Sequence, residues 1–179
     1  MSAAKNMIRM NSLKASFERM GFKNVSTYIN SGNIIFKAEE DDPRRLESDI
    51  EKMLVREYKL ECKVVVRSFA EIAKLIKSLP KSWGGNTDWK YNLIFLRHSI
   101  DSKKILDGLH PKPGIEEVLY RAGTLLWSAR TDGLTRSTMI KLPGQEIYQD
   151  MTVRNLNTAR MLFELMKKSD ENYDDRIGY

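Results

Sequence analysis

The order of helix and strand patterns in the second half of the 179-residue chain is the feature that most restricts its fold. Four strand-like apolar segments occur there, and helix-like spacing of apolar residues separates the first from the second and the third from the fourth. The expected elements are a strand at 91–97, a helix at 101–109, strands at 116–121 and 125–130, a helix at 134–142, a strand near 151–153 and a closing helix at 155–168. The short connection 122–124 predicts that the two middle strands form a hairpin.

This string, β-α-β-β-α-β, is the ferredoxin-like order, which is a split pair of βαβ units. The first half gives a helix at 11–20, strands at 25–30 and 33–38, a helix starting at 41–43, a strand at 63–67 and a helix from Ser68 to Pro80. It is the same string without its first strand. We therefore predict an α+β protein of two ferredoxin-like subdomains packed together, at 1–80 and 91–168, with a loop at 81–90 and a disordered acidic tail at 169–179.

The missing strand has a structural consequence. The first strand of a ferredoxin-like sheet is central and pairs on both sides, so its absence would expose unpaired backbone groups. Either the natural chain begins earlier, or another segment fills the position. The acidic tail and a neighbouring subunit are the two candidates, and the second would make the protein a homodimer through the open sheet.

Composition excludes several classes of protein. No apolar run approaches the ~20 residues of a membrane span, and the N-terminus lacks the apolar core of a signal peptide. The single cysteine, Cys62, excludes an internal disulfide framework and fits a reducing compartment. We therefore expect a cytoplasmic protein without a membrane partner, in which Cys62 is buried in its strand. A net charge of +6 allows attraction to phosphates but also fits an ordinary soluble surface.

Two polar segments carry more hydrogen-bonding side chains than their local structure requires. In the first, a strand-turn-strand at 28–36, Asn30, Ser31 and Asn33 surround Gly32. Gly32 would let backbone N–H groups turn outward toward an anion. The alternative is a tight hairpin whose Asn and Ser side chains bond their own backbone.

The second polar segment, 152–158, lies at the start of the last helix. Free N–H groups and the helix dipole favour an anion there, and Arg154 could add a charged fork beside Asn155 and Thr158. A plain helix cap is the better explanation for Asn155. Arg154 is harder to explain by structure alone, because a cation at a helix N-terminus is unfavourable unless it pairs with something.

Together with the lead-in Lys5-Asn6-x-Ile8-x-Met10, these segments resemble the domain-of-unknown-function 1697 family of bacterial proteins (DUF1697). The similarity extends from about Lys5 to Lys168. Family members usually open with an apolar strand leading into Arg-Gly-Ile-Asn-Val and a Gly-rich turn, of which only the end is present here. The resemblance thus implies the same missing strand, and it adds Asn6 to the candidate site. The family carries no established activity, so the resemblance implies a fold more than a function.

Other notable residues favour structural roles. The aromatic residues Trp83, Trp89 and Tyr91 alternate with lysines and could stack bases, but such residues more often anchor a loop on the core. His98 and His110 have no spaced Cys, His or carboxylate partner, so we predict no metal site. The chain has no phosphate loop, dinucleotide glycine motif or nucleophile elbow, and we predict no cofactor. The stacking aromatics of an RNA-recognition module are also absent.

The sequence therefore predicts a binding protein whose ligand is a small anion or a phosphate backbone, including that of a nucleic acid. The candidate ligand-binding residues are Asn6, Asn30, Ser31, Gly32, Asn33, Arg154, Asn155 and Thr158. Two alternatives stay open. One is an enzyme, although no spacing identifies its reaction and Ser31 or Tyr28 could act only beside a base. The other is a protein-interaction module that dimerises through the open sheet.

Overall fold

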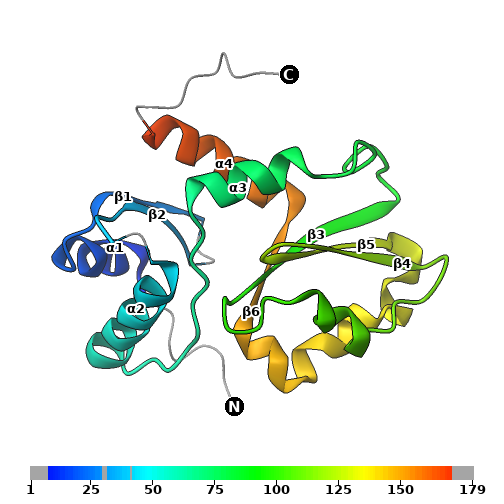
Figure 1. Cartoon of the computed structure of the whole chain (residues 1–179), viewed down its shortest axis with the longest axis horizontal. Coiled ribbons are helices and arrows are strands. Elements are labelled where there is room, and N and C mark those ends of the chain that lie inside the picture. The colour runs from blue at the N-terminus through cyan, green and yellow to red at the C-terminus, as the bar shows by residue number, and fades with distance from the viewer. Residues whose placement is uncertain (1–7, 30–31, 41, 171–179) are drawn as a thin grey trace. The chain divides into compact units, whose positions relative to one another are not determined.

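The computed structural model describes residues 8–29, 32–40 and 42–170 and shows a mixed α+β protein (Figure 1). Its α-helices are α1 (Met10–Arg19), α2 (Pro43–Tyr58), α3 (Phe69–Lys77) and α4 (Leu156–Ser169). Its strands are β1 (Lys23–Tyr28), β2 (Asn33–Lys37), β3 (Trp89–Leu96), β4 (Glu116–Arg121), β5 (Thr124–Arg130) and β6 (Met151–Asn155). Short 3-10 helices form η1 (Lys103–Gly108), η2 (Thr131–Arg136), η3 (Thr138–Gly144) and η4 (Glu146–Asp150).

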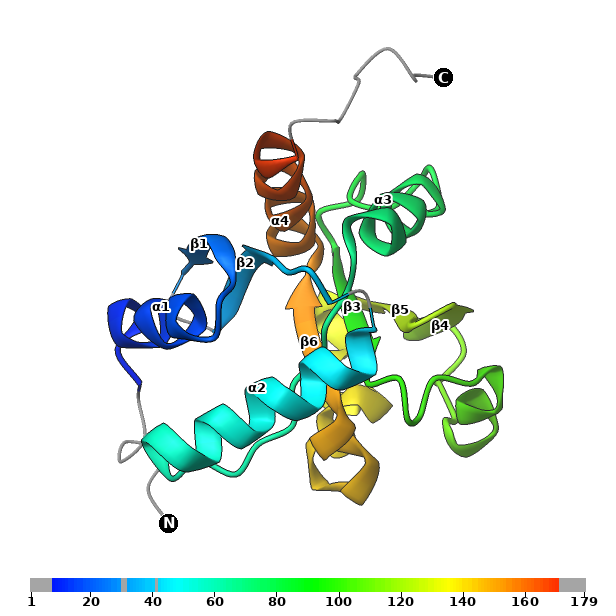
Figure 2. The same cartoon turned by 60° about the vertical axis from the view of Figure 1, so that its left-hand side comes forward.

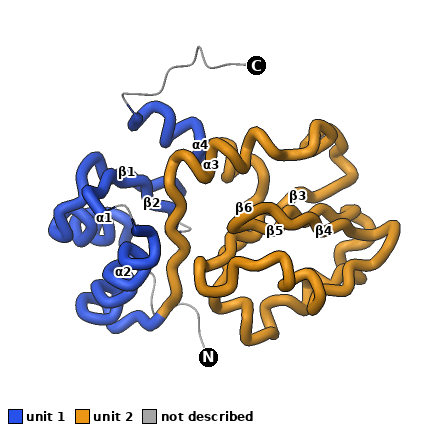
Figure 3. The backbone as a smooth tube through the Cα atoms, in the orientation of Figure 1, with its two compact units in different colours: residues 1–61, 161–179 blue, residues 62–160 orange. Residues whose placement is uncertain are grey.

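The chain divides into two compact units (Figure 3). The first consists of residues 1–61 and 161–179, and the second of residues 62–160. These units differ from the sequence-predicted halves, because α3 belongs to the second unit and most of α4 to the first. Apart from Ser169 and Asp170, the predicted acidic tail lies outside the described residues.

The first unit contains the hairpin of β1 and β2, with α1 and α2. The strands are antiparallel, with Tyr28 opposite Asn33, which confirms the strand-turn-strand prediction. Both helices are amphipathic, and α2 starts as its sequence predicts, with an Asp42 cap and Pro43 in the first turn. The rings of Phe17, Phe22 and Phe36 form one aromatic cluster, with centroids 4.5 to 5.7 Å apart.

The second unit is built on a four-stranded antiparallel sheet in the order β4-β5-β3-β6 (Figure 2). The first strand of the unit, β3, is central and pairs with both β5 and β6. The hairpin of β4 and β5 confirms the prediction for 116–130. One face of the sheet packs on 3-10 segments in a cluster of buried apolar side chains, namely Ile94, Leu96, Leu125, Trp127, Leu142 and Met151.

Three predictions of local structure are corrected. The expected α-helices at 101–109 and 134–142 are instead 3-10 turns, η1, η2 and η3. Both segments are short, and Pro143 lies inside η3, where it cannot donate the hydrogen bond that a continuing helix requires. Cys62 is exposed rather than buried, and the segment around it does not form the expected strand.

The structure assigns no strand at 63–67, where the sequence predicts one. Within its described residues, the first unit shows the two strands β1 and β2. The ferredoxin-like arrangement of the N-terminal half stays a prediction. No helix in the described part of the chain combines the length and apolar character needed to cross a membrane.

Candidate functional site

The sequence-predicted site residues are distributed over both units. Gly32 and Asn33 belong to the first unit, and Arg154, Asn155 and Thr158 belong to the second. Asn6, Asn30 and Ser31 lie outside the described residues.

In the first segment, Asn33 serves the hairpin itself. Its side chain is 6% exposed, and its Nδ2 atom donates a hydrogen bond to the Tyr28 carbonyl at 3.2 Å. Gly32 has a φ of 73°, which lies in the left-handed region that glycine adopts without strain. For these two residues the contacts favour the hairpin interpretation over a ligand-binding role.

In the second segment, Asn155 caps α4. Its Oδ1 atom accepts a hydrogen bond from the Thr158 backbone N–H at 2.8 Å, which confirms the preferred interpretation of this residue. Thr158 takes part through its backbone. The helix starts at Leu156, so Arg154 lies in β6, opposite Leu93, and not inside the helix.

Arg154 is held in a defined orientation. It is half-buried, and its Nη1 atom donates to Thr152 Oγ1 and to the Val153 carbonyl, each at 2.7 Å. Burial lowers the pKa of Arg154 below its ordinary value, because a partly desolvated charge is less stable. A guanidinium keeps its proton in proteins, so a fixed positive charge lies in β6, two residues before α4.

A polar cluster that the sequence did not reveal joins Arg67, Glu71 and His98. The Arg67 guanidinium donates to the carbonyls of Leu96 and Gly123, and its Nη1 atom lies 3.3 Å from His98 Nδ1. His98 Nε2 is 3.6 Å from Glu71 Oε1. These residues are far apart in sequence, so only the fold reveals their proximity. Because Arg67 donates to two backbone carbonyls, we infer that it stabilises the turn between β4 and β5.

A serine and a carboxylate in the first unit resemble a catalytic pair but lack its properties. Ser16 Oγ lies 2.7 Å from Glu57 Oε2 and 2.6 Å from Tyr58 Oη. Ser16 is fully buried, and hydrogen bonds from Ser16, Arg19 and Arg56 lower the pKa of Glu57 to about 2. A carboxylate with so low a pKa is a weak base at neutral pH. The pair therefore joins α1 to α2 rather than activating a nucleophile.

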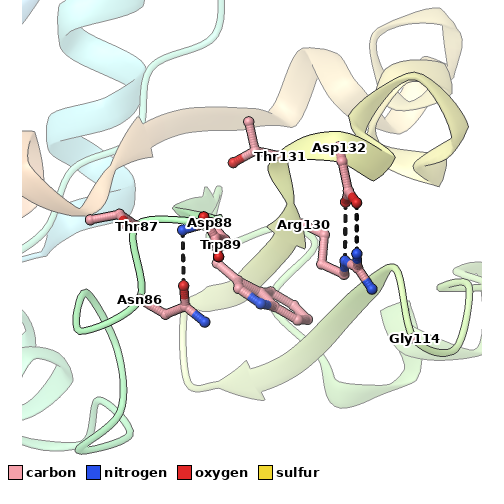
Figure 4. A pocket seen from close by; sticks show the side chains of 8 residues that line it. All are labelled: Asn86, Thr87, Asp88, Trp89, Gly114, Arg130, Thr131 and Asp132. Carbon is pink, nitrogen blue, oxygen red and sulfur yellow. Dashed lines mark hydrogen bonds and ion pairs between the residues drawn. The ribbon is translucent and has the colours of Figure 1, made fainter.

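The second unit also has a pocket of about 570 Å³ at the start of β3 (Figure 4). Its lining residues are Asn86, Thr87, Asp88, Trp89, Gly114, Arg130, Thr131 and Asp132. Trp89 is half-buried there. By contrast, Trp83 is 7% exposed and packs on Tyr91 with ring centroids 5.3 Å apart, as expected for an anchored loop. Within the described ranges, no three His, Cys, Asp or Glu side chains are grouped to hold a metal.

The fold is similar to that of a solved structure, the conserved bacterial protein SP0830 from Streptococcus pneumoniae. The TM-score is 0.78 at 20% sequence identity, and the alignment covers 93% of each chain. At this identity the likeness establishes the fold alone. No curated protein matches the sequence. The profile of the family described as "Protein of unknown function (DUF1697)" matches residues 2–127, well over half of the chain, and the protein therefore belongs to the DUF1697 family.

Proposed function

We propose that this protein is a cytoplasmic binding protein for a small anion or a phosphate backbone, and that Arg154 is its main ligand contact. The observation that carries the proposal is the half-buried guanidinium of Arg154, fixed by Thr152 and Val153 just before the start of α4. A side chain that is already ordered loses less conformational entropy when it binds a ligand.

Two sources of positive potential support an anionic ligand. Arg154 supplies a planar donor group that matches phosphate and carboxylate geometry. The 14-residue helix α4 begins two residues later, and a helix N-terminus carries a partial positive charge. In this proposal Asn155 keeps the helix start in place by capping it, so Asn155 and Thr158 support the site without contacting the ligand.

The proposal extends to the fold. The central position of β3, between β5 and β6, supports a ferredoxin-like arrangement of the second unit, whose first strand would be β3. For the first unit, the ferredoxin-like arrangement rests on the element order of the sequence. Variants of Asn30 and Ser31 test the first polar segment as a separate ligand contact.

The test is ligand binding by the full chain, measured by thermal shift and calorimetry with inorganic phosphate, mononucleotides and short oligonucleotides. We expect Arg154→Ala to weaken binding about tenfold or more, as loss of a charge-assisted contact does. Arg154→Lys should restore part of the affinity, because it keeps the charge but not the fork.

Arg44→Ala is the matched control. Arg44 is an exposed arginine in the first turn of α2, so the control removes the same side chain from another helix start. Equal binding by Arg154→Ala and Arg44→Ala would refute the assignment of Arg154.

A further inference from the structure

We propose that the pocket at the start of β3 is a second binding site, which takes a planar heteroaromatic ring of the nucleobase class. The ring would stack on Trp89, either as part of a free nucleoside or nucleotide or as one base of a single-stranded nucleic acid. This site is separate from Arg154 and does not depend on the anion-binding proposal.

The pocket contains two flat surfaces on one face of the sheet. Trp89 and Arg130 lie directly opposite each other on β3 and β5, so their side chains project from the same face as neighbours. The Arg130 guanidinium is held by a two-point contact with Asp132, at 3.0 Å from Nε and 2.6 Å from Nη2. Indole rings and guanidinium planes are the surfaces on which unpaired bases stack.

The loop that precedes Trp89 is also fixed in place. The backbone N–H of Trp89 donates a hydrogen bond to the Asn86 carbonyl at 3.3 Å. The backbone N–H of Thr131 donates one to the Asp88 carbonyl at 2.7 Å. These bonds attach the loop to the start of η2. The pocket is therefore built from rigid strand ends and a bonded turn, and its volume of about 570 Å³ is in the usual range for small-ligand sites.

Asn86 offers a way to read the edge of a ring. Its Oδ1 atom accepts a hydrogen bond from the Asp88 backbone N–H at 2.9 Å, which orients the amide group. Figure 4 shows Asn86 on one side of the indole and Arg130 on the other. Within the described part of the chain, the Nδ2 atom of Asn86 makes no hydrogen bond. Amide donors beside an aromatic surface recognise the ring nitrogens and carbonyls of bases.

The charges in the pocket favour an uncharged ring over a phosphate. Arg130 is matched by two carboxylates, those of Asp132 and Asp88, which both favour its charged form. Among the lining residues, Arg130 is positive and Asp88 and Asp132 are negative, and Arg136 also interacts with Asp132. The carboxylates near Arg130 therefore leave no excess of positive charge for a phosphate. This charge distribution distinguishes the pocket from the environment of Arg154.

The experiment uses the full chain and the four uncharged ribonucleosides, guanosine, adenosine, cytidine and uridine. We expect at least one of them to shift the NMR signal of the Trp89 indole N–H saturably at millimolar concentration. Calorimetry compares the variants, because they lack the Trp89 signal. Trp89→Ala should weaken nucleoside binding about tenfold, within the range measured for base stacking on aromatic residues. Trp89→Phe should retain part of the affinity, which separates loss of stacking from loss of folding.

Two further variants sharpen the test. Asn86→Asp keeps the oxygen that bonds the Asp88 N–H but removes the amide donors, so it should alter the preference among the four nucleosides. Ile140→Ala, at an exposed apolar residue outside the pocket, should bind like the wild type. Arg44→Ala, at an exposed arginine of α2, should also retain nucleoside binding. The nucleosides carry no phosphate, so failure of one proposal leaves the other open to test.

A ten-nucleotide single-stranded RNA distinguishes the two sources of the ring. Much tighter, Trp89-dependent binding of the RNA than of a mononucleotide would identify a nucleic acid, and equal affinity would identify a free nucleotide. The proposal is wrong if no nucleoside affects the Trp89 signal, or if Trp89→Ala binds nucleosides as well as the wild type does.

Discussion

At the scale of single residues, Glu116 joins two parts of the second unit. It is 3% exposed, and its carboxylate accepts hydrogen bonds from Trp127 Nε1, Ser137 Oγ, the Thr138 N–H and hydroxyl, and the Lys112 N–H. Burial alone would raise the pKa of Glu116, but the hydrogen bonds from Ser137, Thr138 and Lys112 lower it to about 2. The charged form is therefore the one that the fold stabilises.

We expect Glu116→Gln to lower the free energy of unfolding by about 2–3 kcal/mol, because an amide NH₂ would face donors that now bond a carboxylate oxygen. The folded pKa lies below the ordinary value of 4.5. The contribution of Glu116 to stability should thus be complete above about pH 4.5 and be lost as the pH falls toward 2.

Urea unfolding at a series of pH values measures both effects. Glu117→Gln is the control, since Glu117 is exposed on the same strand and its loss should cost less than about 0.5 kcal/mol. If both variants unfold at the same urea concentration, Glu116 does not have the role described.

The individual site residues also show what a sequence can reveal. The capping role of Asn155 was predictable because a cap bonds an N–H three residues away. The contact of His98 with Arg67 and Glu71 was not predictable, since tertiary structure brings the segment after β3 next to the start of α3. Trp89 and Trp83 look equivalent in sequence, and only the fold shows that one is buried and the other lines a pocket.

At the scale of elements, the turn between β4 and β5 combines a left-handed backbone conformation with close packing. Gly123 has a φ of 75°, and a Cβ atom placed on it would lie 2.8 Å from Arg67 Nη2. Arg67 cannot retreat freely, because it donates to the carbonyls of Leu96 and Gly123. Gly114 has the same φ of 75° but no atom within 4 Å of the corresponding Cβ position.

These two glycines form a matched pair for a stability measurement. Gly114→Ala should lower the free energy of unfolding by about 1–2 kcal/mol, because a left-handed conformation is unfavourable for an L-residue. Gly123→Ala should lower the free energy of unfolding by at least about 1 kcal/mol more than Gly114→Ala does, because the hydrogen bonds of Arg67 must also shift. Chemical denaturation of both variants provides the comparison, and equal losses would show that Arg67 does not constrain the turn.

Elements differ in how well the sequence predicts them. The hairpins β1–β2 and β4–β5 were predictable because two runs of strand-forming residues flank a short turn that contains a glycine, Gly32 or Gly123. The 3-10 segments were mistaken for α-helices because a short apolar run has no length over which the helical period can be distinguished. Their packing against the sheet core, through residues such as Leu142, is a tertiary effect.

At the scale of the whole molecule, charge separates the two proposed sites. The chain carries a net charge of +6, and its last eleven residues contain four acidic residues and one arginine, so the remainder is more basic than the total suggests. A basic body attracts phosphates over a distance set by the salt concentration. The Trp89 pocket is different, because its own carboxylates outnumber its guanidinium.

We therefore expect two probes of the full chain to differ in how strongly their binding depends on salt. Binding of a ten-nucleotide RNA should weaken as salt rises, with a slope of log K against log salt of about −0.7 for each phosphate contacted. Arg154→Ala should make that slope shallower by about the contribution of one phosphate.

Nucleoside binding at Trp89 should hardly change between 50 and 500 mM salt (roughly a tenfold range), because stacking of an uncharged ring releases no counterions. A nucleoside affinity that fell as steeply as that of the RNA would place both ligands on the same charged surface, whereas an RNA affinity indifferent to salt would remove the phosphate contact at Arg154.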